Sequence, residues 1–213
     1  MIHAYDDLYL DKARRSLAQM LDYAVYDLKY DIAVFFDLFI STGIASLFEK
    51  GDANTLVGRS GVELAWEVLN RSGITYEPIP PTGTSERSEE YWAGWSLAYY
   101  QWATSMSFAD IVRYVPIREI VSLYHPYHEM DILQFVDCMN DLIHRAQPET
   151  NLKRLRTRSG YSQSQLAKVS GVPIRTIQQY EQRQKDINKA QAEYLIRLSS
   201  ALDCNLSDLI EKV

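Results

Sequence analysis

The chain has 213 residues, 46% of them hydrophobic and 23% charged, a balance typical of a globular protein with one or two domains. It contains no apolar run of 18 or more residues, and its start lacks the basic segment and apolar block of a signal peptide, so neither a membrane-spanning helix nor a signal peptide is expected. The net charge of −6 is unevenly divided along the chain. Residues 1–148 carry 21 acidic and 11 basic side chains, whereas residues 149–213 carry 7 acidic and 11 basic side chains. Only the C-terminal part is therefore suited to attract phosphate groups.

Apolar residues recur at spacings of three and four through the first part of the chain, which is the period of an amphipathic helix. They predict helices over 6–28, 30–48 and 60–71, with a loop at 49–54. The helix over 30–48 is the most apolar, so we expect it to be central to the N-terminal core. The sequence Ser41-Thr42-Gly43 within it is a candidate kink or break.

A stretch rich in Pro, Gly and Thr, residues 77–85, is expected to be a loop. After it, the same periodicity predicts helices over 88–105, 109–114, 116–124 and 129–146, with Ser107 or Thr104 as the cap of the second. His125-Pro126 indicates a turn, and Gln147-Pro148-Glu149-Thr150 indicates a short boundary between two domains.

Four aromatic residues form one stripe on the helix over 88–105, because their offsets of 0, 3, 7 and 10 match the helical period. They are Trp92, Trp95, Tyr99 and Trp102. The simplest interpretation of the stripe is a face that packs into the core. The alternative is a pocket for an aromatic ligand or a surface for a protein partner.

The sequence offers little support for a metal site or an enzyme. His125 and His128, followed by Glu129, have a spacing that can bind zinc, but Pro126 disfavours a regular helix there and the order matches no zinc-protease motif. The glycine-rich phosphate loops and the nucleophile elbow of common enzymes are absent. Cys138 and Cys204 lie in different regions, so no disulfide framework is expected, which fits a reducing cytoplasm. We therefore expect no cofactor and no metal.

Residues 161–180 have the pattern of two short helices joined by a tight turn. Ser162 is a good N-cap, and Gln165 stands three residues later, where a capping box places its Gln. Leu166, Ala167 and Val169 would give the first helix an apolar face. Gly171 tolerates the left-handed backbone of a sharp turn, and Pro173 suits the first position of a new helix.

The second of these helices would bury Ile177 and Tyr180 on one face and expose Arg175, Gln178 and Gln179 on the other. Arg can pair with guanine and Gln with adenine through two hydrogen bonds in the DNA major groove. The basic residues Arg154, Arg156 and Arg158 are expected to form a solvated face, with a contact to the DNA backbone as the alternative. The remaining apolar residues at helical spacing would close a small core, and they are Leu152, Leu155, Val172, Ile187, Leu195, Leu198, Leu202, Leu206 and Leu209.

At these residues the chain resembles the Xre family of helix-turn-helix proteins, which includes lambda repressor and Cro. The matching positions are Leu152-Lys153-Arg154-Leu155-Arg156, Ser162-Gln163, Leu166-Ala167, Gly171-Val172, residues 177–181, residues 198–202 and residues 206–210. Pro173 stands where many relatives carry Ser or Thr, and the residues after Glu181 lack the Gly that relatives usually have there.

The resemblance implies a five-helix domain that binds double-stranded DNA, usually as a homodimer on a palindromic site. It places Ile174, Arg175, Thr176, Gln178 and Gln179 at the base-facing positions. It places Gln163, Arg183 and Lys185 near the phosphates.

The sequence thus predicts an all-α protein with an acidic N-terminal domain of unknown role, residues 1–148, and a lambda repressor-like domain, residues 150–213. The leading hypothesis is a sequence-specific transcriptional regulator that represses its own gene. One alternative is an antitoxin-like protein, in which the N-terminal domain binds a partner protein while the helix-turn-helix represses the operon. The other is a regulator that responds to a small molecule bound at the aromatic stripe.

Overall fold

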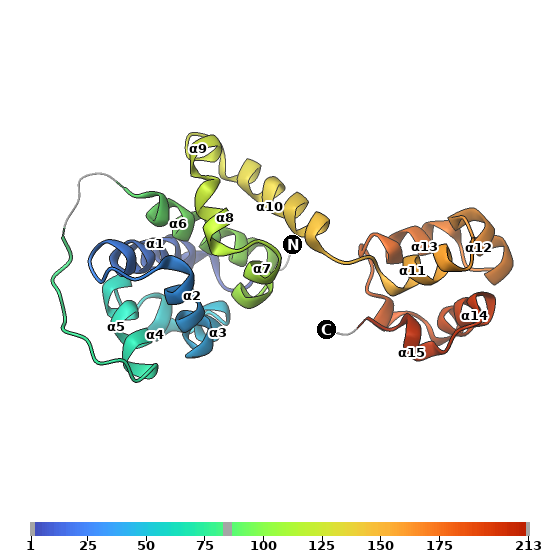
Figure 1. The fold of residues 1–213 in the computed structure, drawn as a ribbon, viewed down its shortest axis with the longest axis horizontal. Helices are drawn as coiled ribbons and strands as arrows, with labels where there is room; N and C mark the ends of the chain where they lie inside the picture. Colours follow the sequence, from blue (N-terminus) through green and yellow to red (C-terminus); the bar gives the residue numbers. More distant parts are fainter. Residues whose placement is uncertain (1–2, 83–86, 212–213) are drawn as a thin grey trace. The chain divides into compact units, whose positions relative to one another are not determined.

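The computed structural model describes residues 3–82 and 87–211, and every regular element within them is a helix, which confirms the predicted all-α class (Figure 1). The chain divides into two compact units, Met1–Ala146 and Gln147–Val213. Each unit has its own cluster of buried hydrophobic side chains. In the described ranges, no helix has the length and hydropathy needed to cross a membrane.

The helices follow one another closely along the chain. Those of the N-terminal unit are η1 (Asp7–Tyr9), α1 (Leu10–Tyr26), α2 (Ile32–Ser41), α3 (Ile44–Glu49), α4 (Ala53–Leu56), α5 (Gly61–Arg71), α6 (Glu89–Thr104), α7 (Phe108–Tyr114), α8 (Ile117–Ser122), α9 (Tyr124–Tyr127) and α10 (Ile132–Ala146). Those of the C-terminal unit are α11 (Asn151–Arg158), α12 (Gln163–Ser170), α13 (Ile174–Glu181), η2 (Ile187–Lys189), α14 (Ala192–Leu202) and α15 (Leu206–Leu209).

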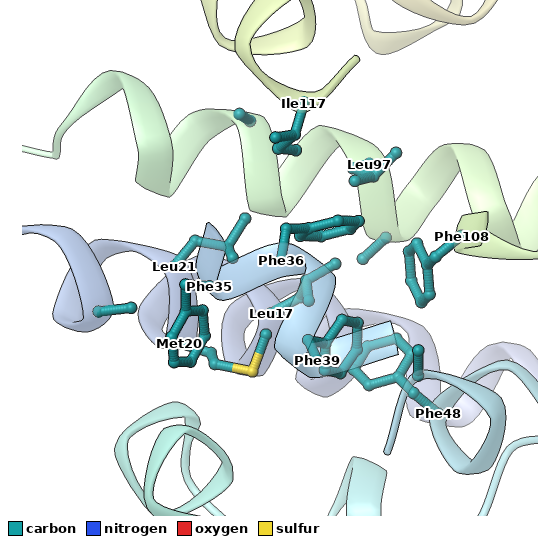
Figure 2. Close-up of a cluster of buried hydrophobic side chains, with 14 of the residues drawn as sticks. Leu17, Met20, Leu21, Phe35, Phe36, Phe39, Phe48, Leu97, Phe108 and Ile117 are labelled. Carbon is teal, nitrogen blue, oxygen red and sulfur yellow. The ribbon is translucent and has the colours of Figure 1, made fainter. Parts of the chain in front are cut away.

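The N-terminal core is built around α1, which packs against both α5 and α6. Side chains from α1 to α8 and from α10 meet in this core. The side chains labelled in Figure 2 come from six of these helices and are Leu17, Met20, Leu21, Phe35, Phe36, Phe39, Phe48, Leu97, Phe108 and Ile117. The segment over 30–48 supplies all the phenylalanines of this set except Phe108. The expectation that this segment is central to the core is therefore confirmed.

Gly94 allows α6 to approach the backbone of α1. A Cβ atom at this position would stand 2.8 Å from both the Cα of Ala18 and the carbonyl oxygen of Leu17. Both distances are well inside van der Waals contact, so a residue without a side chain is required where the two helices cross.

Two of the predicted long helices are interrupted. The helix expected over 6–28 begins at Leu10, because the side chain of Asp6 accepts a hydrogen bond from the Leu8 amide and the chain first forms η1. Leu8, an apolar residue within the helix expected over 6–28, lies in η1 and is 83% exposed. The segment over 30–48 breaks at the predicted place, where Gly43 adopts a φ of 78° between α2 and α3.

Three local predictions were wrong. The loop expected at 49–54 contains the start of α4, which is capped by the side chain of Asp52. The turn expected at His125-Pro126 is the short helix α9, where Pro126 is tolerated because it lies in the first turn. The helix expected from Glu129 begins only at Ile132, since the Asp131 side chain accepts the Leu133 amide hydrogen and acts as a cap.

The chain between α5 and α6 is described only as far as Thr82 and again from Arg87, so part of the loop expected over 77–85 lies outside the described residues. Residues 77–82 have no regular structure, as predicted. The hydroxyl of Tyr23 fixes this segment to α1 by donating to the Ile79 carbonyl at 2.5 Å, while it accepts a hydrogen bond from the indole of Trp66 at 3.0 Å.

The segment between α10 and α11 is held by residues of the C-terminal unit. Thr150 caps α11, and its side chain accepts the amide hydrogen of Lys153. Glu149 forms an ion pair with Lys153 at 2.9 Å. The carbonyl of Pro148 accepts a hydrogen bond from Arg183 at 2.9 Å.

Candidate nucleic-acid interface and aromatic pocket

Helix α12 and the turn after it are determined by local sequence. The Ser162 hydroxyl accepts the Gln165 amide hydrogen at 3.2 Å, and the Gln165 side chain accepts the Ser162 amide hydrogen at 2.7 Å. This is the predicted capping box. At the other end, Gly171 adopts a φ of 69° and donates to the Ala167 carbonyl, so the chain turns sharply toward α13.

Helix α13 is anchored by the two side chains that the sequence predicts to be buried. Ile177 is fully buried and Tyr180 nearly so. Pro173 is the N-cap rather than the first residue of the helix, and its carbonyl accepts the amide hydrogen of Ile177. Because Pro has no side-chain acceptor, the start of α13 lacks the capping bond that Ser or Thr would supply.

The opposite face of α13 is accessible. Ile174 is 43% exposed and Arg175 is exposed, while Thr176, Gln178 and Gln179 are half-buried. Arg175 has no acidic partner within ion-pairing distance among the described residues. The face therefore offers a free guanidinium, two amides and one apolar side chain.

A buried ion pair lies at the C-terminal end of α13. Arg156 binds Glu181 in a bidentate manner, with nitrogen–oxygen distances of 2.6 and 3.0 Å, and donates a third hydrogen bond to the Tyr161 carbonyl at 2.7 Å. The Arg156 side chain is only 12% exposed and the Glu181 side chain 3%. Hydrogen bonding to Glu181 raises the pKa of Arg156. The prediction of Arg156 as part of a solvated face was wrong, whereas Arg154 and Arg158 are exposed.

The same carboxylate orients Gln163, which in turn contacts Gln178. Gln163 donates from its side-chain amide to Glu181 at 2.7 Å, and the Gln178 amide lies 3.5 Å from the Gln163 carbonyl oxygen. The ion pair thus links α11 and α13 with the first residue of α12. This ion pair was not predicted from the sequence. The available signal is a Glu directly after the buried Tyr180 and an Arg directly after the buried Leu155.

Arg183 and Lys185 follow α13 and are both exposed. Arg183 has a φ of 53°, a left-handed conformation that favours glycine, at the place where the resembling family usually has one. Besides Pro148, its guanidinium meets Glu211 at 3.7 Å. Val169 and Leu206, predicted to be buried, are 57% and 45% exposed, because the core is already closed by Leu166, Leu202 and Leu209.

The aromatic stripe of α6 divides into two parts. Trp102 is buried, and its indole donates to the Tyr5 carbonyl at 2.9 Å, while Tyr99 packs against it with ring centroids 5.7 Å apart. Both therefore belong to the packed face that was the simplest interpretation. Trp92 and Trp95 are only half-buried and border a pocket.

This pocket has a volume of about 280 Å³ and lies between the start of α6 and the α9 region. Its lining residues are Arg87, Tyr91, Trp92, Trp95, Tyr124, Tyr127, His128, Met130 and Ile132. The sequence contains two hints of it, a pair of Trp and a pair of Tyr, each three residues apart. Periodicity alone does not reveal that the two pairs face a common space.

Arg14 of α1 lies behind Trp95, with its guanidinium carbon 3.2 Å from the centre of the indole ring. Burial lowers the pKa of Arg14, but an arginine stays charged in proteins. Its Nη2 atom has no hydrogen-bond partner in the described parts of the chain. A positive charge is therefore held against the back of one pocket wall.

The two histidines of the considered metal motif have other roles. His125 lies 3.4 Å from Glu89, and Nδ1 of His128 lies 2.9 Å from the Tyr124 carbonyl oxygen, so that nitrogen carries a proton. The described residues contain no group of three or more side chains arranged to hold a metal ion.

Comparison with known proteins supports the interpretation of the C-terminal unit. Residues 152–209 match the family model described as "Helix-turn-helix". No curated protein and no solved structure matches the chain. The matched segment coincides with the capped pair α12 and α13 and the helices packed around them. Residues 152–209 are therefore a DNA-binding helix-turn-helix domain of the Xre, or lambda repressor-like, family.

Proposed function

We propose that the protein is a sequence-specific transcriptional regulator that reads the DNA major groove with α13 and represses its own gene. The observation that carries the proposal is the accessible face of α13, where Arg175, which forms no ion pair with any described residue, stands beside Gln178 and Gln179. Arg175 would donate two hydrogen bonds to a guanine, and the glutamines would bind adenines. The exposed Ile174, and the methyl group of Thr176, would contact thymine methyl groups.

The buried network supports this proposal because it fixes one of the reading side chains in advance. Gln178 is held through Gln163 to Glu181, and Glu181 is held by Arg156. A side chain ordered before binding loses less conformational entropy when it meets a base. Gln163 stands at the start of α12, where free amide groups also favour a phosphate.

The test is fluorescence anisotropy of the full-length protein with its own upstream DNA, at two salt concentrations and with a scrambled competitor. Arg175→Ala should weaken binding to the cognate site by about 1–3 kcal/mol and relax the preference for one base pair. Arg145→Ala is the matched control, because it removes one exposed positive charge from α10 in the other unit and should leave affinity unchanged.

Two results would count against the proposal. If Arg175→Ala and Arg145→Ala bind the cognate site equally well, α13 does not read bases through Arg175. If the wild-type protein binds both DNAs weakly and equally, the operator lies elsewhere or a second protein is required. Co-purification of a stoichiometric partner would then favour the antitoxin-like alternative.

Arg183 and Lys185 are proposed to contact phosphates, and Arg183→Gly separates this role from folding. Glycine removes the strain of the left-handed φ, about 1 kcal/mol. It also removes one partly exposed ion pair, worth about 0–1 kcal/mol, and the hydrogen bond to Pro148. The unfolding free energy should therefore change by less than ~1 kcal/mol.

Binding of Arg183→Gly to DNA should nevertheless weaken about equally on all sequences. The slope of log affinity against log salt should become shallower by about 0.9, the value for one lost phosphate contact. An unchanged slope would mean that Arg183 serves only to hold Pro148 and Glu211.

We propose homodimerisation on a palindromic site as part of this function, since two recognition helices about one DNA turn apart are the usual arrangement for the motif. We also propose, as a second function, that the N-terminal unit binds a small molecule. The preformed pocket beside Trp92 and Trp95 favours this over a purely structural role.

A further inference from the structure

We propose that the pocket between α6 and α9 binds a small planar aromatic carboxylic acid. The inference rests on the ligand-binding function proposed above for the N-terminal unit, and it does not depend on how α13 binds DNA. A volume of about 280 Å³ is at the lower end of the range of ligand pockets, which limits the occupant to one or two rings.

The walls of the pocket are flat and held in place. Trp92 makes edge contacts with Tyr124 and with the buried Phe135, at centroid distances of 5.8 and 5.4 Å. Tyr124 is in turn stacked on His128 at 4.3 Å. Aromatic walls that are packed from behind retain their spacing without a ligand, so they favour a rigid planar ring over a flexible chain.

The charged side chain that lines the pocket favours an anion, because Arg87 is the one Arg, Lys, Asp or Glu among the described lining residues. Four carboxylates of the described residues near the pocket already have partners: Glu89 has His125 at 3.4 Å, Glu90 has the Tyr26 hydroxyl at 3.0 Å, Glu129 has His128 at 3.6 Å, and Asp131 accepts the Leu133 amide hydrogen at 2.8 Å. Arg87 lines the pocket without an acidic partner among the residues described, and its side chain is exposed. A carboxylate can therefore accept hydrogen bonds from Arg87 without displacing an existing ion pair.

Arg14 and Arg87 also argue against an organic cation, the usual occupant of an aromatic cage. The guanidinium of Arg14 covers one face of Trp95 at 3.2 Å, and that of Arg87 lies 5.2 Å from the ring centre of Tyr91. Two of the rings thus already interact with a positive charge. A second cation nearby would be repelled, whereas an anion would be attracted.

The experiment is isothermal titration calorimetry of the full-length protein with three indoles that differ only in the end group: indole-3-acetate, indole-3-ethanol and tryptamine. We expect the acid to bind at least tenfold more tightly than the alcohol, and the amine to bind more weakly than the alcohol. Arg87→Gln should lower the affinity for the acid to that for the alcohol and leave the affinity for the alcohol unchanged. Arg113→Gln is the matched control, because this exposed arginine of α7 does not line the pocket.

The outcomes separate the ligand class from the ligand-binding function. Tightest binding of tryptamine, or equal binding of acid and alcohol, would overturn the carboxylate inference while the pocket remained a ligand site. If the Arg87→Gln variant binds the acid with the same affinity as the Arg113→Gln variant, Arg87 does not bind the carboxylate of the ligand. If none of the three indoles binds at millimolar concentration, both the inference and the ligand-binding function fail.

Discussion

Replacing Glu181 with Gln should destabilise the C-terminal unit by about 3–5 kcal/mol, the usual cost of removing one partner of a buried ion pair. Gln has nearly the same shape, so the packing around it is retained, but the charge that faces Arg156 is lost. The guanidinium would then remain largely buried, with its side chain 12% exposed, without the charged partner that it binds through two hydrogen bonds. Such a charge is far more costly than an unpaired neutral group.

The two units can be followed separately in the full chain. All four tryptophans, Trp66, Trp92, Trp95 and Trp102, lie in the N-terminal unit, so urea unfolding detected by Trp fluorescence reports on that unit. Hydrogen exchange of the amides in α11 and α13 reports on the other. Glu181→Gln should accelerate this exchange roughly 100-fold or more and leave the Trp transition unchanged.

Two controls make the interpretation specific. Glu149→Gln removes the same charge from an exposed ion pair with Lys153 and should cost no more than about 1 kcal/mol. The double variant Arg156→Met, Glu181→Leu removes both charges and should recover most of the loss, because apolar side chains of similar size can replace a buried pair. If Glu181→Gln exchanges no faster than Glu149→Gln, the ion pair contributes nothing to stability.

Gly94→Ala should lower the unfolding free energy of the N-terminal unit by about 2 kcal/mol. Alanine favours a helix by ~1 kcal/mol relative to glycine, but overpacking a tight contact costs about 1–3 kcal/mol or more. The atoms that the new methyl group would meet, Ala18 Cα and the Leu17 carbonyl oxygen, belong to a backbone. A backbone inside a buried helix cannot move aside as the end of a side chain can, so we expect the upper end of that range.

The measurement is the midpoint of the Trp-detected urea transition. It should fall for Gly94→Ala and fall further for Gly94→Val, while hydrogen exchange in α11 to α15 stays the same. A midpoint that rises for Gly94→Ala would mean that the extra methyl group causes no unfavourable contact between α1 and α6. The change in stability would then reflect only the higher helix propensity of alanine.

Much of the local structure could be predicted because it depends on residues within four positions of one another. Ser162, Gly171 and Ser107 determine where helices begin or end through bonds to the nearest backbone groups. The buried face of α13 follows in the same way from the spacing of Ile177 and Tyr180. The predictions that were wrong, such as the turn at His125-Pro126, concern single turns, where a cap or a proline in the first turn decides between helix and loop.

The features that could not be predicted depend on contacts between distant segments. Arg156 and Glu181 are 25 positions apart, and nothing in the charge pattern of 154–158 distinguishes Arg156 from its exposed neighbours Arg154 and Arg158. The pocket requires the start of α6 to face α9, which the helical period of neither element specifies. Half of the aromatic stripe was packed and half lined the pocket, so a single interpretation of the stripe could not be correct for all of it.

The segment between α10 and α11, which connects the two units, is short. Only residues 147–150 separate the two helices, and a chain of four residues reaches at most ~14 Å. Pro148, Glu149 and Thr150 are moreover held by Arg183, Lys153 and the start of α11, so little of this tether is free. If two N-terminal units associate, binding of the second DNA-binding domain to its half-site therefore becomes an intramolecular event. Avidity of this kind would let two individually weak half-site contacts act together as a tight one.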